Sequence, residues 1–123
     1  MILGLDQWLC KKSINNDEED KIIYWRKCNQ IHGWFDKQCN GIENCKEYDI
    51  TYEQIKELKN TCQKVLDNHE LASELLPVTM GCFFGSYNYD DDYFYDLEYT
   101  IKSLNELLDE SDVSDEFYYH AWW

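Results

Sequence analysis

The sequence lacks an uninterrupted apolar run of the roughly 20 residues that a helix needs to cross a bilayer. Residues 1–10 carry Asp6 and lack a basic start followed by a long apolar stretch, so we expect no secretory signal and a cytoplasmic location. Proline occurs once, at Pro77, and no internal repeat or low-complexity linker interrupts the 123 residues. We therefore expect one domain spanning residues 1–123.

Basic residues are scarce. The chain has 11 lysines and arginines against 25 acidic residues, and its only arginine is Arg26. Residues 86–123 hold eleven acidic residues and one basic residue, Lys102, which gives this third a formal charge of −10. Such a field repels phosphate backbones and anionic membranes, and it attracts a basic protein groove. The sequence thus disfavours direct nucleic-acid and membrane binding, although an acidic surface also serves to keep a protein soluble.

Cysteine motifs are also missing. Six cysteines occur, without a C-x-x-C pair or a regular framework, and in a chain without export signals they are expected to be reduced thiols. A zinc site that includes Cys39 and Cys45 is the weaker interpretation, because their spacing departs from that of usual zinc ligands. We therefore predict no metal site and no cofactor.

What the chain does have is helical patterning, so the predicted fold is mainly α. We expect a compact bundle of three to four helices with at most a short two-stranded β element. Helices are predicted at 5–12, 17–39, 52–65, 70–76 and 91–109. The pieces 47–50 and 117–122 are expected to be extended, the second as an edge strand, and to pair with each other.

Two helix starts carry the clearest local signals. Thr51 and Gln54 fit a capping box, in which each side chain accepts a hydrogen bond from the other's backbone N–H. Acidic residues at 90–92 suit the positive end of a helix dipole. Apolar residues recur at helical spacing after both starts, at Ile55, Leu58, Cys62 and Val65 and at Phe94, Leu97, Ile101, Leu104 and Leu108.

The most unusual segment is 24–35. On a helix, an arginine, an amide, an imidazole and an indole would project within one or two turns of each other. Such a set suits an anion or a planar ring, because arginine offers a bidentate fork and tryptophan stacks. The predicted ligand-binding residues are Trp25, Arg26, Lys27, Asn29 and His32. The structural alternative is that Trp25 and His32 belong to the core and that Arg26 pairs with an acid.

The second candidate is the glycine-bounded loop at 81–88 with the acids that follow. It lacks the pattern of a phosphate loop, so paired aromatics that cap the core or form a contact patch are the remaining interpretations. Three consecutive aspartates on a helix start point in different directions, which is unlike a calcium loop. The predicted partner-contact residues are Phe83, Phe84, Tyr87, Asp90, Asp91 and Asp92.

Enzyme chemistry finds little support. A nucleophile needs a base within reach and a group that orients the base, and no local signature of this kind occurs among the three histidines and six cysteines. We therefore predict no catalytic residue and no enzymatic activity.

Over residues 20–120 the sequence resembles a family of small phage and prophage proteins to which we attach no activity. The residues that carry this resemblance are Tyr24-Trp25-Arg26-Lys27, Asn29, Ile31-His32, Trp34-Phe35, Cys45, Glu47-Tyr48, Leu75-Leu76-Pro77, Gly81, Phe83-Phe84-Gly85-Ser86, Tyr89-Asp90 and Phe117-Tyr118-Tyr119-His120. The family usually has alanine in place of Cys28, which counts against a metal role for that thiol.

The resemblance implies an accessory or counter-defence protein that acts in the host cytoplasm. Together with the acidic field, it leads us to expect a non-enzymatic inhibitor that binds a host or competitor defence protein. The alternative is a protein that sequesters a nucleotide-like or other small anionic ligand on Trp25, Arg26, Asn29 and His32. The aromatic content also makes a homo-oligomer plausible.

Overall fold

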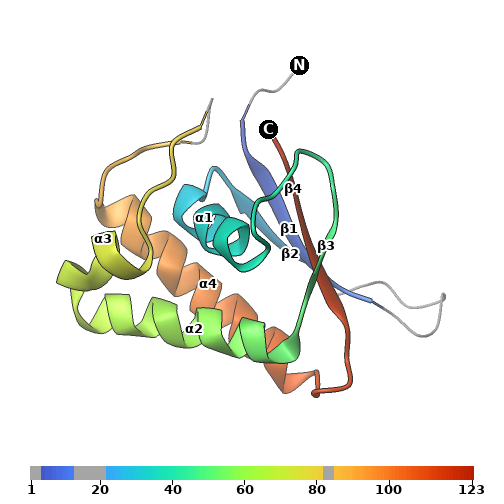
Figure 1. The fold of residues 1–123 in the computed structure, drawn as a ribbon. Coiled ribbons are helices and arrows are strands. Elements are labelled where there is room, and N and C mark those ends of the chain that lie inside the picture. Colours follow the sequence, from blue (N-terminus) through green and yellow to red (C-terminus); the bar gives the residue numbers. More distant parts are fainter. Residues whose placement is uncertain (1–3, 13–21, 82–84) are drawn as a thin grey trace.

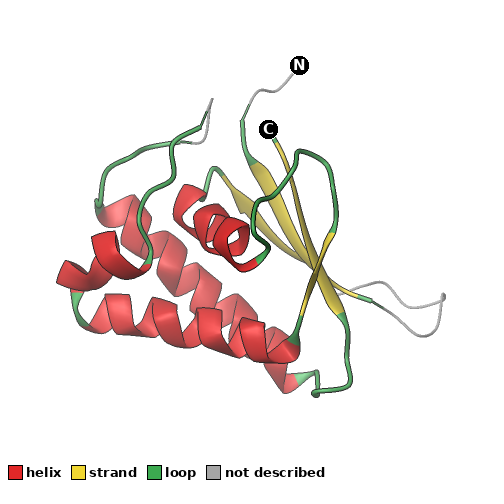
Figure 2. Cartoon of the chain, viewed as in Figure 1, coloured by secondary structure: helices red, strands yellow, loops and turns green. Residues whose placement is uncertain are grey.

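The computed structural model describes residues 4–12, 22–81 and 85–123. Along the chain these form β1 (Asp6–Lys11), β2 (Ile22–Arg26), α1 (Asn29–Gln38), β3 (Tyr48–Ile50), α2 (Tyr52–Asp67), a 3-10 turn (His69–Leu71), α3 (Ala72–Leu75), α4 (Asp91–Asp109) and β4 (Phe117–Trp122). Strands and helices segregate to opposite sides of the molecule (Figure 2).

The strands make one antiparallel sheet in the order β2-β1-β4-β3. The first and last strands of the chain pair over their whole length, from Asp6 opposite Trp122 to Lys11 opposite Phe117. Strand β2 adds to the free side of β1, with Trp8 opposite Tyr24. Such pairing joins residues more than a hundred positions apart, so it depends on tertiary structure and not on local preference.

This sheet overturns the predicted fold class. The protein is a mixed α/β fold with four strands, and not a helical bundle with at most two strands. Residues 5–12 and 22–26, predicted as helix, are strands in which successive side chains lie on opposite sides of the sheet. Both sides carry large apolar side chains, so the alternation of apolar and polar residues that marks a half-buried strand is missing.

Helix α1 lies between the sheet and the pair formed by α2 and α4 (Figure 1). It is short and buried on almost every side, and its Phe35 stacks on Tyr119 of β4 with ring centroids 4.0 Å apart. Gly33 allows the segment after Pro77 to approach the helix closely, since a Cβ there would lie 2.0 Å from the hydroxyl oxygen of Thr79. A side chain at this position would force Thr79 to move.

The predictions for α2 and α4 are confirmed. The Thr51–Gln54 capping box is present, and Ile55, Leu58, Cys62 and Val65 are the buried residues of α2. Helix α4 spans the predicted residues, and the carboxylate of Asp90 caps it by accepting a hydrogen bond of 3.1 Å from the backbone N–H of Tyr93. These local signals are reliable because each depends on neighbours within one or two helical turns.

The predicted extended pieces also form and pair, as β3 and β4. The position of the second one was wrong, because β4 lies between β1 and β3 and is not an edge strand. None of the helices in the described ranges combines the length and the apolarity that a membrane span requires.

Candidate functional site

The predicted ligand-binding cluster is divided by strand β2, because neighbouring residues of a strand face opposite ways. Trp25 is 2% exposed and its indole Nε1–H donates a hydrogen bond of 2.9 Å to Thr100 of α4. Arg26 lies on the other side of the sheet and is ion-paired with Asp6, with Nη1 and Oδ1 2.6 Å apart. The predicted helix would have placed the indole beside the guanidinium, and the strand separates them.

The polar members of the cluster bond within the protein. Asn29 accepts a hydrogen bond from the backbone N–H of Thr79 at 2.9 Å and donates one to the carbonyl of Ser86 at 2.8 Å. His32 shares a hydrogen bond of 2.8 Å with the Tyr119 hydroxyl, and burial lowers the pKa of its imidazole to about 4. A neutral, buried imidazole contributes no positive charge to an anion site at neutral pH.

Lys27 is exposed and takes a positive φ of 54°, while its backbone N–H donates to the carbonyl of Leu5 at 2.6 Å. Gly85 packs against this turn, because a Cβ there would lie 2.8 Å from the Lys27 carbonyl oxygen. The five predicted ligand residues therefore organise the junction between β2, α1 and the loop, and their described bonds are directed at protein groups.

The predicted contact loop is only partly described. Phe83 and Phe84 lie outside the described residues. Tyr87 is exposed, and its hydroxyl both donates to the carbonyl of Gly81 at 2.7 Å and accepts from the Gly81 N–H at 3.3 Å, which closes the loop on itself. Asp90 serves as the cap of α4, and Asp91 and Asp92 are exposed in its first turn.

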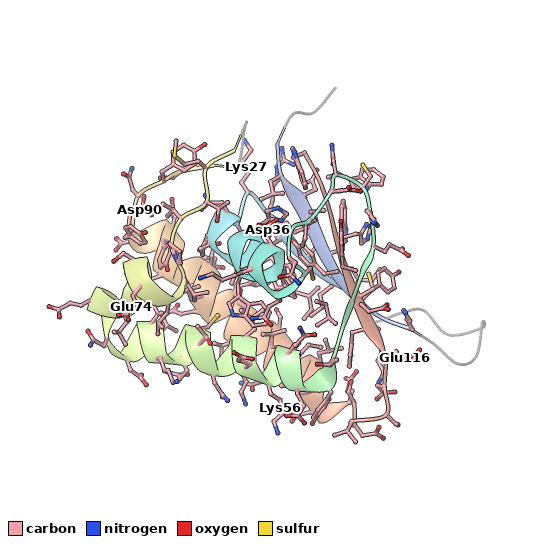
Figure 3. The ribbon with its side chains drawn as sticks, viewed as in Figure 1. Lys27, Asp36, Lys56, Glu74, Asp90 and Glu116 are labelled. Carbon is pink, nitrogen blue, oxygen red and sulfur yellow. The ribbon has the colours of Figure 1, made fainter. Side chains whose placement is uncertain are left out.

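The acidic field is concentrated on the solvent side of α4. Asp90 at the start of this helix and Glu116 after its end mark the two ends of the field (Figure 3). We call the exposed side of the helix the α4 face, and its members are Asp91, Asp92, Tyr95, Glu98, Tyr99, Lys102, Glu106 and Asp109. Within the described ranges, no lysine or arginine lies within 4.0 Å of the five carboxylates of this face.

Two tyrosines stand among these carboxylates. Tyr95 is 66% exposed, and Tyr99, one helical turn later, is 38% exposed. Tyr99 donates from its hydroxyl to the backbone carbonyl of Tyr24 on β2 at 2.8 Å. Aromatic residues are enriched at the centres of protein interfaces, where they supply much of the buried area. Their spacing of four residues on the polar side of the helix was a signal in the sequence that the prediction overlooked.

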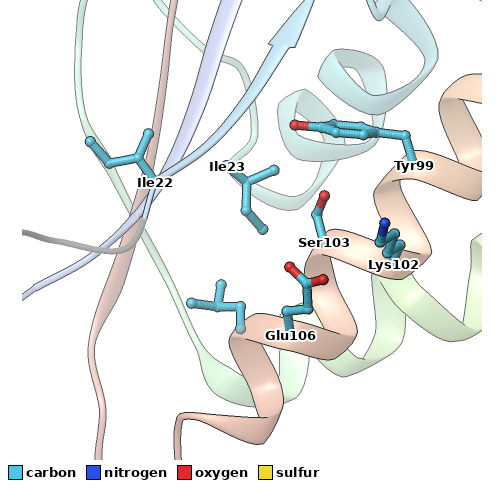
Figure 4. Close-up of a pocket in the computed structure, with 7 residues that line it drawn as sticks. Ile22, Ile23, Tyr99, Lys102, Ser103 and Glu106 are labelled. Atoms are coloured by element: carbon cyan, nitrogen blue, oxygen red, sulfur yellow. The ribbon is translucent and has the colours of Figure 1, made fainter.

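Two hollows flank the α4 face. The first, of about 340 Å³, lies between β2 and α4 and is lined by Ile22, Ile23, Tyr99, Lys102, Ser103, Glu106 and Leu107 (Figure 4). The second, of about 550 Å³, lies between α2 and α4 and is lined by Leu66, His69, Asp91, Asp92, Phe94, Tyr95 and Glu98. The helix is thus a ridge between two depressions. The one beside α2 is acidic, and the one beside β2 carries both Lys102 and Glu106.

The buried ionisable groups offer little reactivity. Burial raises the pKa of the Cys62 thiol to about 12, and it raises that of Cys28 well above its ordinary value. Burial also raises the pKa of Asp96 to about 6, although hydrogen bonds with Cys28 and Gln30 oppose the shift. Among the described residues, no group of three His, Cys, Asp or Glu side chains could share a metal ion.

A second surface was missed altogether at the sequence level. Trp8, Tyr24, His120 and Trp122 come from three different strands and lie together on the side of the sheet away from α1. The ring of Trp8 is 4.9 Å from His120, 5.5 Å from Trp122 and 5.6 Å from Tyr24. No local spacing in the chain could have shown this cluster, because the strand pairing creates it.

Comparison of the chain with known proteins identified no relative. A comparison with models of protein families, a search of curated proteins and a search of solved structures each found no match. The resemblance to small phage proteins therefore stays a prediction. What the chain itself presents is a mixed α/β domain with an acidic, tyrosine-bearing helix face.

Proposed function

We propose that this protein is a non-enzymatic inhibitor that binds a basic surface of another protein through its α4 face. In keeping with the resemblance to phage and prophage proteins, the proposed partner is a host or competitor defence protein. The observation that carries the proposal is the exposure of Tyr95 and Tyr99 among five carboxylates, none of which has a described lysine or arginine within ion-pair distance.

Electrostatics and shape support the same partner chemistry. Like charges crowded on one helix face raise the potential above it, and lysines or arginines of a partner relieve this repulsion when they dock. The hollow beside α2 exposes Asp91, Asp92 and Glu98, whereas the hollow beside β2 holds Glu106 together with Lys102. Basic side chains of a partner can therefore enter the hollow beside α2 while the tyrosines pack along the helix.

The alternative of a sequestered small anion loses its support. It required Trp25, Arg26, Asn29 and His32 to line one pocket, but the strand and the buried hydrogen bonds direct their polar groups to different protein partners. The single guanidinium is already occupied by the carboxylate of Asp6.

A titration with a lysine-rich peptide tests where basic chains bind. Amide shifts in NMR spectra of the whole chain should cluster on 91–109, and the affinity should fall steeply as salt rises, because a Debye length of about 8 Å at physiological ionic strength screens exposed charges. The variant Glu98→Lys should weaken binding by about three- to tenfold. The matched variant Glu57→Lys makes the same change of charge on exposed α2 and should have a much smaller effect.

Equal losses in the two variants would mean that the peptide senses only the net charge, and the α4 face would no longer be a specific site. Capture from host extracts with the same three proteins then searches for the partner. A partner that binds the wild-type chain and the α2 variant but not the α4 variant is expected, and one that resists high salt or ignores the α4 substitution would contradict the proposal.

A further inference from the structure

The side of the sheet away from α1, which we call the outer sheet face, is not covered by any described helix (Figure 1). Its central residue is Trp8 on β1, and Tyr24, His120 and Trp122 surround it. Trp122 is 51% exposed and Tyr24 is 41% exposed, and Ile22 at the end of β2 is 57% exposed. Large apolar side chains gathered on one open surface of a folded protein commonly mark an interaction site.

The charges of this face differ from those of α4. At one end, Arg26 is ion-paired with Asp6 at 2.6 Å, and at the other, Lys12 is ion-paired with Asp49 at 2.7 Å. Acids and bases therefore balance among these four residues, although the whole chain carries −14. Both ends of the face thus carry acids together with a base, unlike the α4 face, on which acids predominate.

A second copy of the same chain fits this pattern. Asp6 begins β1 and Lys12 directly follows its last residue, where its backbone N–H still donates to the carbonyl of Glu116 at 2.8 Å. Residues an even number of positions apart along an extended chain face the same side. When two copies stack outer face to outer face with their β1 strands antiparallel, the Lys12 of each lies above the Asp6 of the other. Such reciprocal contacts are what an interface with two-fold symmetry requires. The aromatic centre then packs against its own copy.

We propose that the outer sheet face is the interface of a homodimer, centred on Trp8 with Trp122 beside it. The sheets pack face to face at about 10 Å, as in a β-sandwich, and the aromatic rings fill the space between them. The α4 faces adjoin the β2 edge of each sheet, where Tyr99 donates to the carbonyl of Tyr24, and are not part of the stacked surface. The dimer thus presents two acidic helices at once, which raises the avidity for any partner with two basic sites.

The expected dimer is weak. Stable interfaces bury about 800 Å² per subunit, and a face made of a few short strands lies at the lower end of this range, so a dissociation constant on the order of micromolar is expected. The charge of −14 on each copy opposes association at long range. Added salt screens this repulsion and leaves the apolar contact intact, so the dimer should strengthen with salt. Binding through α4 should weaken with salt, so the two proposals can fail separately.

Sedimentation velocity of the whole chain between about 5 and 500 µM, at low and high salt, tests the dimer over the range of a micromolar dissociation constant. The mass should rise from 14.9 kDa to twice that value with concentration, and further at high salt. Trp122→Asp should remain monomeric because it places a charge beside Trp8 within the interface. The control Tyr95→Asp makes the same kind of change at an exposed aromatic residue of α4 and should dimerise like the wild-type chain.

A wild-type chain that stays at 14.9 kDa under all conditions would overturn the homodimer, and so would a dimer that survives Trp122→Asp. Addition of a single-stranded oligonucleotide completes the experiment, because exposed aromatic rings also stack on bases. We expect no saturable change in tryptophan emission. Saturable quenching that Trp122→Asp abolishes would assign the face to nucleic-acid bases instead and would also overturn the proposal.

Discussion

The two sides of the sheet carry similar residues and differ in what covers them. Trp25 and Tyr119 on the inner side are at most 2% exposed, because α1 and α4 pack over them. Trp8, Tyr24 and Trp122 on the outer side belong to the same strands and remain at the surface. Residue type alone therefore does not decide burial. A side chain is buried where a second layer of structure can be placed against it.

The sides also differ in how polar groups are satisfied. On the inner side, each polar tip has a fixed partner inside the protein, as in the Gln7 amide that both donates to and accepts from the Cys28 backbone at 3.0 and 2.8 Å. On the outer side, Asp6 accepts hydrogen bonds from Tyr24 and Arg26 at the protein surface. Partial burial raises the pKa of Asp6, but these hydrogen bonds outweigh it and the pKa is lowered. Loss of a hydrogen bond on the inner side leaves a buried polar group without a partner, whereas water can replace a lost hydrogen bond on the outer side.

Truncating one tryptophan on each side of the sheet tests most directly whether the two sides contribute differently to stability. Trp25→Ala removes a buried indole and leaves its hydrogen-bond partner Thr100 unpaired, so the free energy of unfolding should fall by about 3–5 kcal/mol. Trp122→Ala, half exposed, should cost less than about 1 kcal/mol. Urea unfolding at low protein concentration measures both values without a contribution from self-association. Similar losses would mean that the outer side is as closely packed as the inner one.

Removal of the buried amide of Gln7 should cause the second largest loss of stability. Gln7→Ala opens a cavity and leaves the backbone N–H and carbonyl of Cys28 without partners, so we expect a loss of about 2–3 kcal/mol. The neighbouring Asp6→Ala removes an ion pair and hydrogen bonds that water can replace, for a loss below about 1 kcal/mol. The same urea titrations apply, and a larger effect at Asp6 than at Gln7 would reverse the assignment of the two sides.

The inner side should also respond to pH. Burial lowers the pKa of His32 from 6.5 to about 4, so the folded state favours the neutral imidazole. Its stabilising contribution is complete above pH 6.5 and is lost as the pH falls toward 4. Asp96 acts in the opposite direction, because burial raises its pKa from 3.8 to about 6 and protonation favours the folded state as the pH falls through this window.

Because the two groups oppose each other, the variant Asp96→Asn should reveal the contribution of His32. In this variant the free energy of unfolding should fall by about 2 kcal/mol between pH 6.5 and 4 through His32 alone. Adding His32→Asn should remove that part of the decline. Unfolding curves at four pH values give the slopes, and parallel slopes in the single and double variants would show that His32 titrates normally in the folded protein.

Removal of one tyrosine hydroxyl on each side of the sheet should give the smallest difference in stability between the two sides. Tyr119→Phe breaks the buried hydrogen bond with His32 and should cost about 1 kcal/mol, while Tyr24→Phe breaks the exposed bond with Asp6 and should cost a few tenths. Thermal unfolding of the two variants in parallel resolves a difference of this size in a domain of this length. A greater loss in Tyr24→Phe would show that the outer face is already ordered as an interface.

Local sequence signals predicted the parts of the fold that form through near neighbours. The Thr51 capping box, the cap at Asp90 and the apolar stripes of α2 and α4 each involve residues within a few turns, and all were recovered with their boundaries nearly correct. The extended segments before α2 and at the C-terminus were recovered for the same reason, since each is short and flanked by clear helix boundaries.

The helix predicted at 17–39 is wrong over residues 22–26, which form strand β2. The segment contains apolar, aromatic and basic residues without a polar alternation, so a helix and a doubly covered strand fit it about equally well. Strand β1 decides between them by pairing with β2 along its whole length. Once β2 is a strand, Trp25 and Arg26 face opposite ways, and the predicted ligand site cannot form.

The two long amphipathic helices, their caps and the strongly acidic last third could be read from the amino-acid sequence, because each is a property of nearby residues or of composition. The three-dimensional fold was needed to show that the first and last strands pair, that α1 is buried between two layers, and that Trp8, Tyr24 and Trp122 meet on an open face. The physical reason is that side-chain burial and strand pairing depend on contacts between distant parts of the chain, which no local period records.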